Sequence, residues 1–93
     1  MEKDLENEIV MYCKCMGGLA LKLKLDGQRG WPDRTLLFPG AKIGFIEAKT
    51  EIGTLKYQQV EWIRKLTELG FDVAVIRTPQ DAKKFIDYVR AAP

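Results

Sequence analysis

Asp33, Glu47 and Lys49 are the residues whose types and spacing best fit a chemical role in this chain. Asp33 follows a Gly/Pro turn and opens an apolar run, and Glu47 and Lys49 lie near the end of the next apolar run. Residues i and i+2 of a strand point the same way, so the Glu47 carboxylate and the Lys49 ammonium should share one face. Charges buried in such a strand are costly unless they are paired or hold a metal ion. The pattern therefore favours a metal-binding functional site over the simpler alternative, a surface ion pair beside an unrelated turn residue.

Histidine is absent from the sequence, and its absence excludes whole classes of chemistry. Ser-His-Asp and Cys-His catalysis, and zinc or iron sites rich in histidine, all need that side chain. Cys13 and Cys15 are too few for a structural zinc site within one chain, and we interpret them as free thiols. Any hydrolysis must therefore use carboxylates, lysine and a hard cation.

The composition is that of an ordinary globular domain. The chain has 93 residues, 46% of them hydrophobic and 30% charged, with a net charge of +2. This length fits one domain over residues 1–93, at a size where dimerisation often adds stability. No apolar run approaches the roughly 20 residues of a membrane span, and the charged N-terminus does not resemble a signal peptide. We expect a soluble, intracellular (cytoplasmic) protein.

Hydrophobic periodicity predicts the element order α-β-β-β-α-β-α. The expected elements are a helix over 2–16, strands over 19–25, 34–38 and 42–49, a helix over 55–69, a strand over 71–76 and a helix over 80–91. In the first strand, leucines alternate with Ala20, Lys22 and Lys24, which predicts one apolar and one basic face. The third strand is mostly apolar, as expected at the centre of a sheet. The fold class is α/β: a mixed four-stranded sheet flanked by helices.

Two polar residues interrupt the apolar stripes of the first two helices. Glu8 lies three residues after Leu5, on or beside the inward face, and Gln59 lies four residues before Ile63. A buried glutamine needs partners for both ends of its amide, and a buried glutamate needs a cation or a proton. We expect both side chains to join the candidate site, although boundary positions or satisfied core polar groups would also fit.

The chain resembles the VRR-NUC branch of the PD-(D/E)XK nuclease superfamily. The resemblance is carried by the stretches Gly30-Trp31-Pro32-Asp33, Ile46-Glu47-Ala48-Lys49 and Gly53-Thr54-Leu55, with Gln59 and Glu61-Trp62 beyond them. The predicted element order also matches the restriction-endonuclease-like core of that superfamily. One departure is Lys56-Tyr57, which stands where the branch usually has serine and proline. The resemblance implies metal-dependent cleavage of DNA phosphodiesters, and small stand-alone members are similar to Holliday junction resolvases that act as homodimers.

The catalytic residues predicted from the residues and the resemblance together are Asp33, Glu47, Lys49, Gln59 and Glu8. Asp33 and Glu47 supply oxygen ligands for Mg²⁺ or Mn²⁺, with the Ala48 carbonyl and Glu8 as further ligands. Lys49 would polarise the attacking water or neutralise the pentacovalent oxyanion. Gln59 would position Lys49 or the water.

DNA is the expected partner, and basic residues near the site would contact its phosphates without reading bases. They are Lys22, Lys24, Arg29 and Arg34. A four-way junction presents two strands to cut, which favours a homodimer. Exposed apolar candidates for its interface are Trp31, Phe38, Tyr57 and Tyr88. The alternatives are a nuclease of this fold acting on flap, nicked or plain duplex DNA, and a non-catalytic nucleic-acid-binding module.

Overall fold

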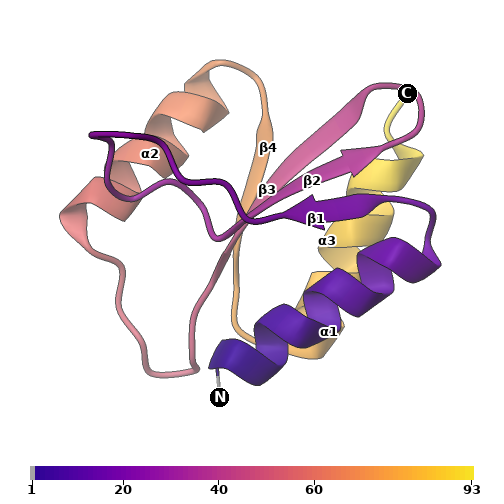
Figure 1. Ribbon diagram of the computed structural model, residues 1–93, viewed down its shortest axis with the longest axis horizontal. Coiled ribbons are helices and arrows are strands. Elements are labelled where there is room, and N and C mark those ends of the chain that lie inside the picture. The colour runs from indigo at the N-terminus through magenta and orange to yellow at the C-terminus, as the bar shows by residue number, and fades with distance from the viewer. Residues whose placement is uncertain (1) are drawn as a thin grey trace.

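The predicted element order is confirmed. A computed structural model describes residues 2–93, which form three helices and one sheet (Figure 1). In chain order the elements are α1 (Glu2–Cys15), β1 (Leu19–Leu21), β2 (Arg34–Phe38), β3 (Lys42–Ala48), α2 (Tyr57–Glu68), β4 (Asp72–Ile76) and α3 (Pro79–Ala91).

The sheet has the order β1-β2-β3-β4. β1 pairs with β2, and β2 with β3, in antiparallel fashion, whereas β3 and β4 run parallel and are joined by the α2 crossover. The apolar third strand therefore lies between two neighbours, as its composition predicts. This arrangement sends β3 and β4 toward the same end of the sheet, where Lys49 and Arg77 follow them.

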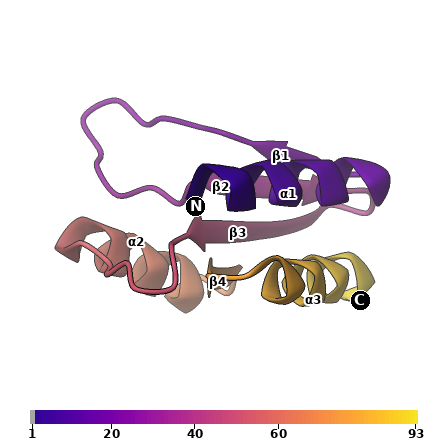
Figure 2. The ribbon, with the colours of Figure 1, turned by 90° about the horizontal axis from the view of Figure 1, so that it is seen from below.

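One face of the sheet is covered by α1 and α3, which also pack against each other (Figure 2). The core between these layers includes the fully buried Ile9, Leu36, Ile46 and Ile86. Gly44 of β3 lies on this face against α3, where a Cβ atom would come within 2.8 Å of the Val89 side chain. The helices thus pack closely on the middle of the sheet.

The opposite face is only partly covered. α2 packs against β4, and Trp62 of α2 joins an aromatic cluster with Trp31, Phe45 and Phe71. Ring centroids in this cluster are 5.1 to 5.5 Å apart, in edge-to-face arrangements. Within residues 2–93, no helix lies over the β1–β2 side of this face.

The first strand is shorter than predicted. β1 ends at Leu21, and an isolated bridge between Leu25 and Gln28 is all that remains of pairing further along. Its faces are also reversed relative to the leucine pattern: Ala20 packs toward the core, while Leu19 is 56% exposed on the uncovered face. The leucine alternation therefore marks an outward apolar surface.

Other boundaries shift slightly. α2 begins at Tyr57 rather than near residue 55 and ends at Glu68, leaving Leu69 exposed. β4 begins at Asp72 and is mostly half-buried because it is an edge strand, whereas its continuous apolar run predicts a buried strand. Of the expected interface residues, Phe38 is buried and Trp31 lies in the aromatic cluster, whereas Tyr57 and Tyr88 are exposed.

Both cysteines carry free thiols, as expected. Cys13 is buried in the core, where desolvation raises the pKa of its thiol to about 11, and Cys15 is exposed. Across residues 2–93, each helix falls short of the length and apolarity that crossing a membrane would require.

Candidate active site

Glu47 and Lys49 lie on one face at the end of β3, as the i, i+2 spacing predicts. Glu47 is only 1% exposed, and its Oε2 lies 3.8 Å from the Lys49 Nζ. The Lys49 N–H donates to the Ile76 carbonyl at 3.0 Å, which continues the ladder past the strand end and fixes the backbone there. A nearly buried carboxylate thus shares its face with a nearly buried ammonium.

Asp33 is brought to this point by the turn Gly30-Trp31-Pro32. Gly30 has φ of 89° and lies against the first turn of α2, Trp31 packs on Phe45, and Pro32 is buried. The Asp33 Oδ2 then accepts a hydrogen bond of 2.8 Å from the Ala48 N–H. A strand residue directs its N–H and C=O to the same edge, so the Ala48 carbonyl points to the Asp33 side as well.

Gln59 connects the site to the start of α2. Its Nε2 donates to the Glu47 Oε2 at 3.1 Å, and its Oε1 accepts from the Lys56 N–H at 2.8 Å. Both ends of the amide are therefore used, which determines its orientation. The same side chain thus satisfies the backbone N–H of the N-cap residue Lys56, whose own side chain makes no cap hydrogen bond.

The electrostatics of Glu47 are those of a crowded acidic site. The pKa of its carboxyl is raised to about 8, chiefly by burial, then by the hydrogen bond with Asp33 and the negative charge of Asp33, against the opposing charge of Lys49. Two carboxyls in contact resist ionising together, so a proton or a cation must be shared between them.

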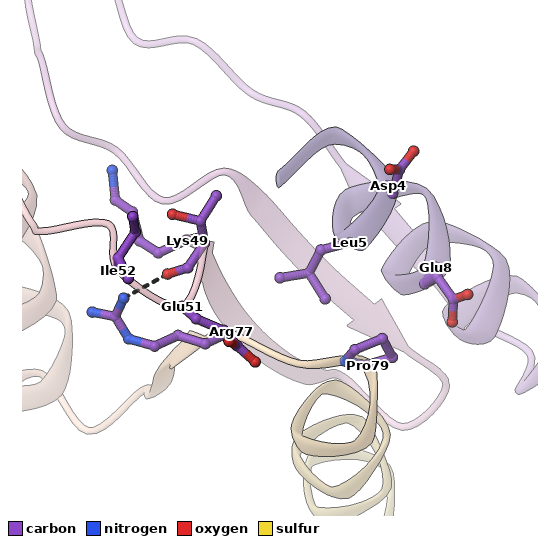
Figure 3. A pocket seen from close by; sticks show the side chains of 9 residues that line it. Asp4, Leu5, Glu8, Lys49, Glu51, Ile52, Arg77 and Pro79 are labelled. Atoms are coloured by element: carbon purple, nitrogen blue, oxygen red, sulfur yellow. Dashed lines mark hydrogen bonds between the residues drawn. The ribbon is translucent and has the colours of Figure 1, made fainter. Parts of the chain in front are cut away.

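The acidic residues of α1 that reach the site are Glu2 and Glu6. Carboxylate oxygens of Glu2, Glu6 and Asp33 all lie within 4.8 Å of one another. The structure does not bring Glu8 to this cluster: Glu8 is exposed and lies across Leu5 from Lys49 (Figure 3). The sequence contains a pattern that predicts the inward position of Glu2 and Glu6. These two residues lie on one helical stripe with Ile9 and Cys13, which are core residues.

The predicted DNA-contacting residues divide into two groups. Lys22, Lys24 and Arg29 are exposed on the irregular segment 22–30. Arg34 is less available for contact with DNA phosphates. Its side chain is only 17% exposed, and its Nε donates to the Glu6 Oε1 at 3.1 Å. Arg34 instead holds Glu6, and through it α1, against β2.

The donor set fits a hard divalent cation. Asp33 and Glu47 offer carboxylate oxygens in contact with each other, and the Ala48 carbonyl points to the same edge. Glu2 and Glu6 form an acidic cluster with Asp33 that adds negative charge there. Oxygen donors of this kind suit Mg²⁺ or Mn²⁺, and a cation there would replace the proton shared by the two central carboxyls. A water molecule or phosphate oxygen bound next to Lys49 would contact an amine that Glu47 already orients.

An αβββαβα fold with an aspartate before the second strand, and Glu-x-Lys at the end of the central strand, defines the PD-(D/E)XK class of nuclease domains. Residues 1–80 match the VRR-NUC domain family, and the chain belongs to that family. A solved structure described as a VRR_NUC domain superposes with a TM-score of 0.86 at 25% identity, covering 94% of this chain and 95% of that one. The chain is also 33% identical over 75 residues to a protein named "Putative nuclease p44" from Acyrthosiphon pisum secondary endosymbiont phage 1, covering 81% of each. These likenesses support nuclease activity.

Proposed function

We propose that this protein is a Mg²⁺- or Mn²⁺-dependent endonuclease that hydrolyses phosphodiester bonds of branched DNA, such as Holliday junctions, as a homodimer. The observation that carries the proposal is the contact between the buried Glu47 carboxyl and Asp33, beside Lys49. A non-catalytic domain gains nothing from burying these charges together, because their desolvation is unfavourable.

Each residue has a definite task in this proposal. Asp33, Glu47 and the Ala48 carbonyl would hold the cation, with Glu2 and Glu6 contributing directly or through water. A bound cation supplies a Lewis acid that lowers the pKa of a coordinated water and offsets negative charge on the phosphate. Lys49, held beside Glu47, would add to the stabilisation of that negative charge. Gln59 would keep the Glu47 carboxylate oriented.

Exposed basic residues support binding of a polyanion. Lys22, Lys24 and Arg29 lie on the segment that leads into the Asp33 turn, so phosphates held there would be close to the site. Such contacts would position the backbone without reading bases, and binding would weaken as salt increases. An intracellular location is consistent with a DNA substrate.

The uncovered sheet face supports a homodimer. Leu19 pairs with Leu37, Leu37 with Ile43, and Phe71 directly precedes β4 beside Ile43, so these four residues form one apolar row across the sheet. Leu19 is 56% and Phe71 38% exposed. We name this row (Leu19, Leu37, Ile43, Phe71) the open-face row. An isologous contact between two such rows would place two sites on one assembly, one for each strand of a junction.

The decisive experiment compares wild-type protein with Glu47→Ala and a matched surface variant, Glu68→Ala. Labelled four-way junction, flap, nicked and plain duplex DNA are incubated with Mn²⁺, Mg²⁺ or EDTA. We expect metal-dependent cutting, fastest on the junction, that Glu47→Ala abolishes and Glu68→Ala retains, with DNA binding largely kept by both variants.

Equal cutting by Glu47→Ala would remove Glu47 from the mechanism. Cutting of plain duplex as fast as the junction would replace structure selectivity with general duplex cleavage. Metal-independent binding without cutting of any substrate would favour a nucleic-acid-binding module.

A further inference from the structure

A short turn directly after Lys49 carries a large apolar side chain at its tip. The Gly53 N–H donates to the Thr50 carbonyl at 3.1 Å, which closes a turn over residues 50–53. Ile52 at the tip is 92% exposed, more than any other large hydrophobic residue within residues 2–93. The turn borders a cavity of about 520 Å³ that Lys49 also lines.

The turn is clamped from beneath by Arg77, the residue after β4 (Figure 3). One guanidinium nitrogen, Nη1, donates to the Thr50 carbonyl at 2.7 Å and to the Gly53 carbonyl at 2.6 Å. These two carbonyls flank the tip, so a single side chain fixes both ends of the turn. Glycine at position 53 also allows this tight turn, since a Cβ there would lie only 2.9 Å from the Thr50 Oγ1.

Single exposed apolar residues are common and usually need no explanation. Ile52 differs because its turn is held in place by Arg77. Fixing this long side chain costs conformational entropy. Other exposed apolar residues, such as Met11 and Tyr88, lie on helices whose opposite faces form the core. A fixed turn that presents isoleucine to water beside Lys49 is suited to meeting an apolar surface that arrives with the substrate.

The apolar surface that DNA offers is the face of a base. Proteins that insert aliphatic side chains at a base step must unstack it, and this penalty is smallest where stacking is already interrupted. We propose that Ile52 is a specificity-determining wedge, which packs on the exposed base at a branch point or nick next to the scissile phosphate. This inference rests on the proposed nuclease function and gives it a physical basis for preferring branched DNA.

The test compares Ile52→Ala with Met11→Ala, which truncates another exposed apolar residue, on α1. Cutting of four-way junction, nicked and plain duplex DNA is measured with Mn²⁺. Ile52→Ala should lower kcat/KM on the junction and nick about tenfold while leaving plain duplex cutting unchanged, as expected when a truncated side chain loses its apolar contact with a base. Met11→Ala should change neither value.

A binding measurement separates this inference from the nuclease proposal. Junction DNA with 2-aminopurine at the branch is titrated with Glu47→Ala protein, with and without the added Ile52→Ala change. We expect a fluorescence change that the second substitution removes without preventing binding. If the wild type cuts nothing, the nuclease proposal fails, and this signal alone still decides for or against the wedge.

Two outcomes would overturn the wedge. One is an unchanged junction-to-duplex ratio in Ile52→Ala, whether cutting is unaffected or falls equally on every substrate. The other is a shift to monomer in sedimentation, which would make Ile52 a dimer contact. Arg77→Lys provides a second variant, because lysine keeps the charge but its side chain ends one atom short of the Nη1 that donates to both carbonyls. It should reproduce a part of the selective loss. A uniform loss on all substrates in Arg77→Lys would instead assign Arg77 to phosphate binding and count against its role as the clamp.

Discussion

At the scale of single residues, the site depends on how Glu47 is held. Its carboxyl is almost fully buried, contacts Asp33, and receives hydrogen-bonding and electrostatic support from Gln59 and Lys49. Without a cation, this environment favours the protonated carboxyl, which makes the site sensitive to both pH and metal ions.

We predict that the metal-free protein loses stability as pH rises from about 4.5 to about 8. The pKa of Glu47 is raised from 4.5 to about 8 in the folded protein, so the native state binds more protons than the unfolded chain over this window. The free energy of unfolding then falls with pH, by up to about 1.4 kcal/mol per pH unit for one such group. Urea denaturation in EDTA at several pH values measures the slope.

The control for this prediction is Glu47→Gln, which removes the titrating group and should flatten the slope, whereas Glu68→Gln should keep it. Adding Mn²⁺ should stabilise the wild type increasingly toward pH 8, because the cation binds the ionised carboxylate. A wild-type stability that rises over the whole window in EDTA would contradict the interpretation of Glu47.

Gln59 gives a second prediction at this scale, because one amide both orients Glu47 and caps α2. Gln59→Ala should lower kcat about 10- to 100-fold, the usual effect of losing a residue that orients a metal ligand. It should also cost about 1 kcal/mol of stability through the lost cap. Gln58→Ala, at the neighbouring exposed position, serves as the control in both cutting and denaturation assays, and a similar loss there would argue against a specific role.

At the scale of elements, the Gly30–Asp33 turn positions the first carboxylate by packing on α2. We predict that Gly30→Ala disturbs the site, since φ is 89° and a Cβ would lie 2.5 Å from the Gln58 backbone. The loss should be roughly 3 kcal/mol, with reduced cutting, because positive-φ strain and a backbone collision act together. Gly27→Ala is the control, because Gly27 has φ of 69° but no atom within 4 Å of an added Cβ. This variant should lose only the backbone strain energy, roughly 1 kcal/mol of stability. Thermal melting followed by circular dichroism compares the two, and equal losses would show that the collision is relieved.

The elements also show what the sequence could and could not predict. The order of elements, the central β3 and the shared face of Glu47 and Lys49 follow from local periodicity, which one strand or helix carries by itself. The sequence does not predict that Ala20 faces the core in place of the leucines, because this depends on where α1 and α3 pack. From the sequence we singled out Glu8 and did not consider Glu6, whose place in the site depends on where Asp33 lies relative to α1. Arg77 carries no sequence signal, since its role is set by two backbone carbonyls.

At the scale of the whole molecule, the sheet presents unequal faces. α1 and α3 cover one face, while within residues 2–93 the open-face row has no helix over it on the β1–β2 side. Leaving such a row in water is unfavourable for a small domain whose core is already limited. In the homodimer proposed above, the same row of a second copy would cover it.

We therefore predict that Leu19→Lys, which places a charge in the open-face row, converts a dimer to a monomer. In an isologous contact the substitution occurs twice, so two ammonium groups would be buried against apolar surface or each other, and the dimer Kd should rise about 100-fold or more. Leu19 is already 56% exposed, so the fold should survive. Sedimentation at assay concentrations measures the change, with Met11→Lys as the control on α1. The monomer should nick a four-way junction without paired incision, because one site reaches only one strand, and a wild type that sediments strictly as a monomer while making paired cuts would refute this use of the open face.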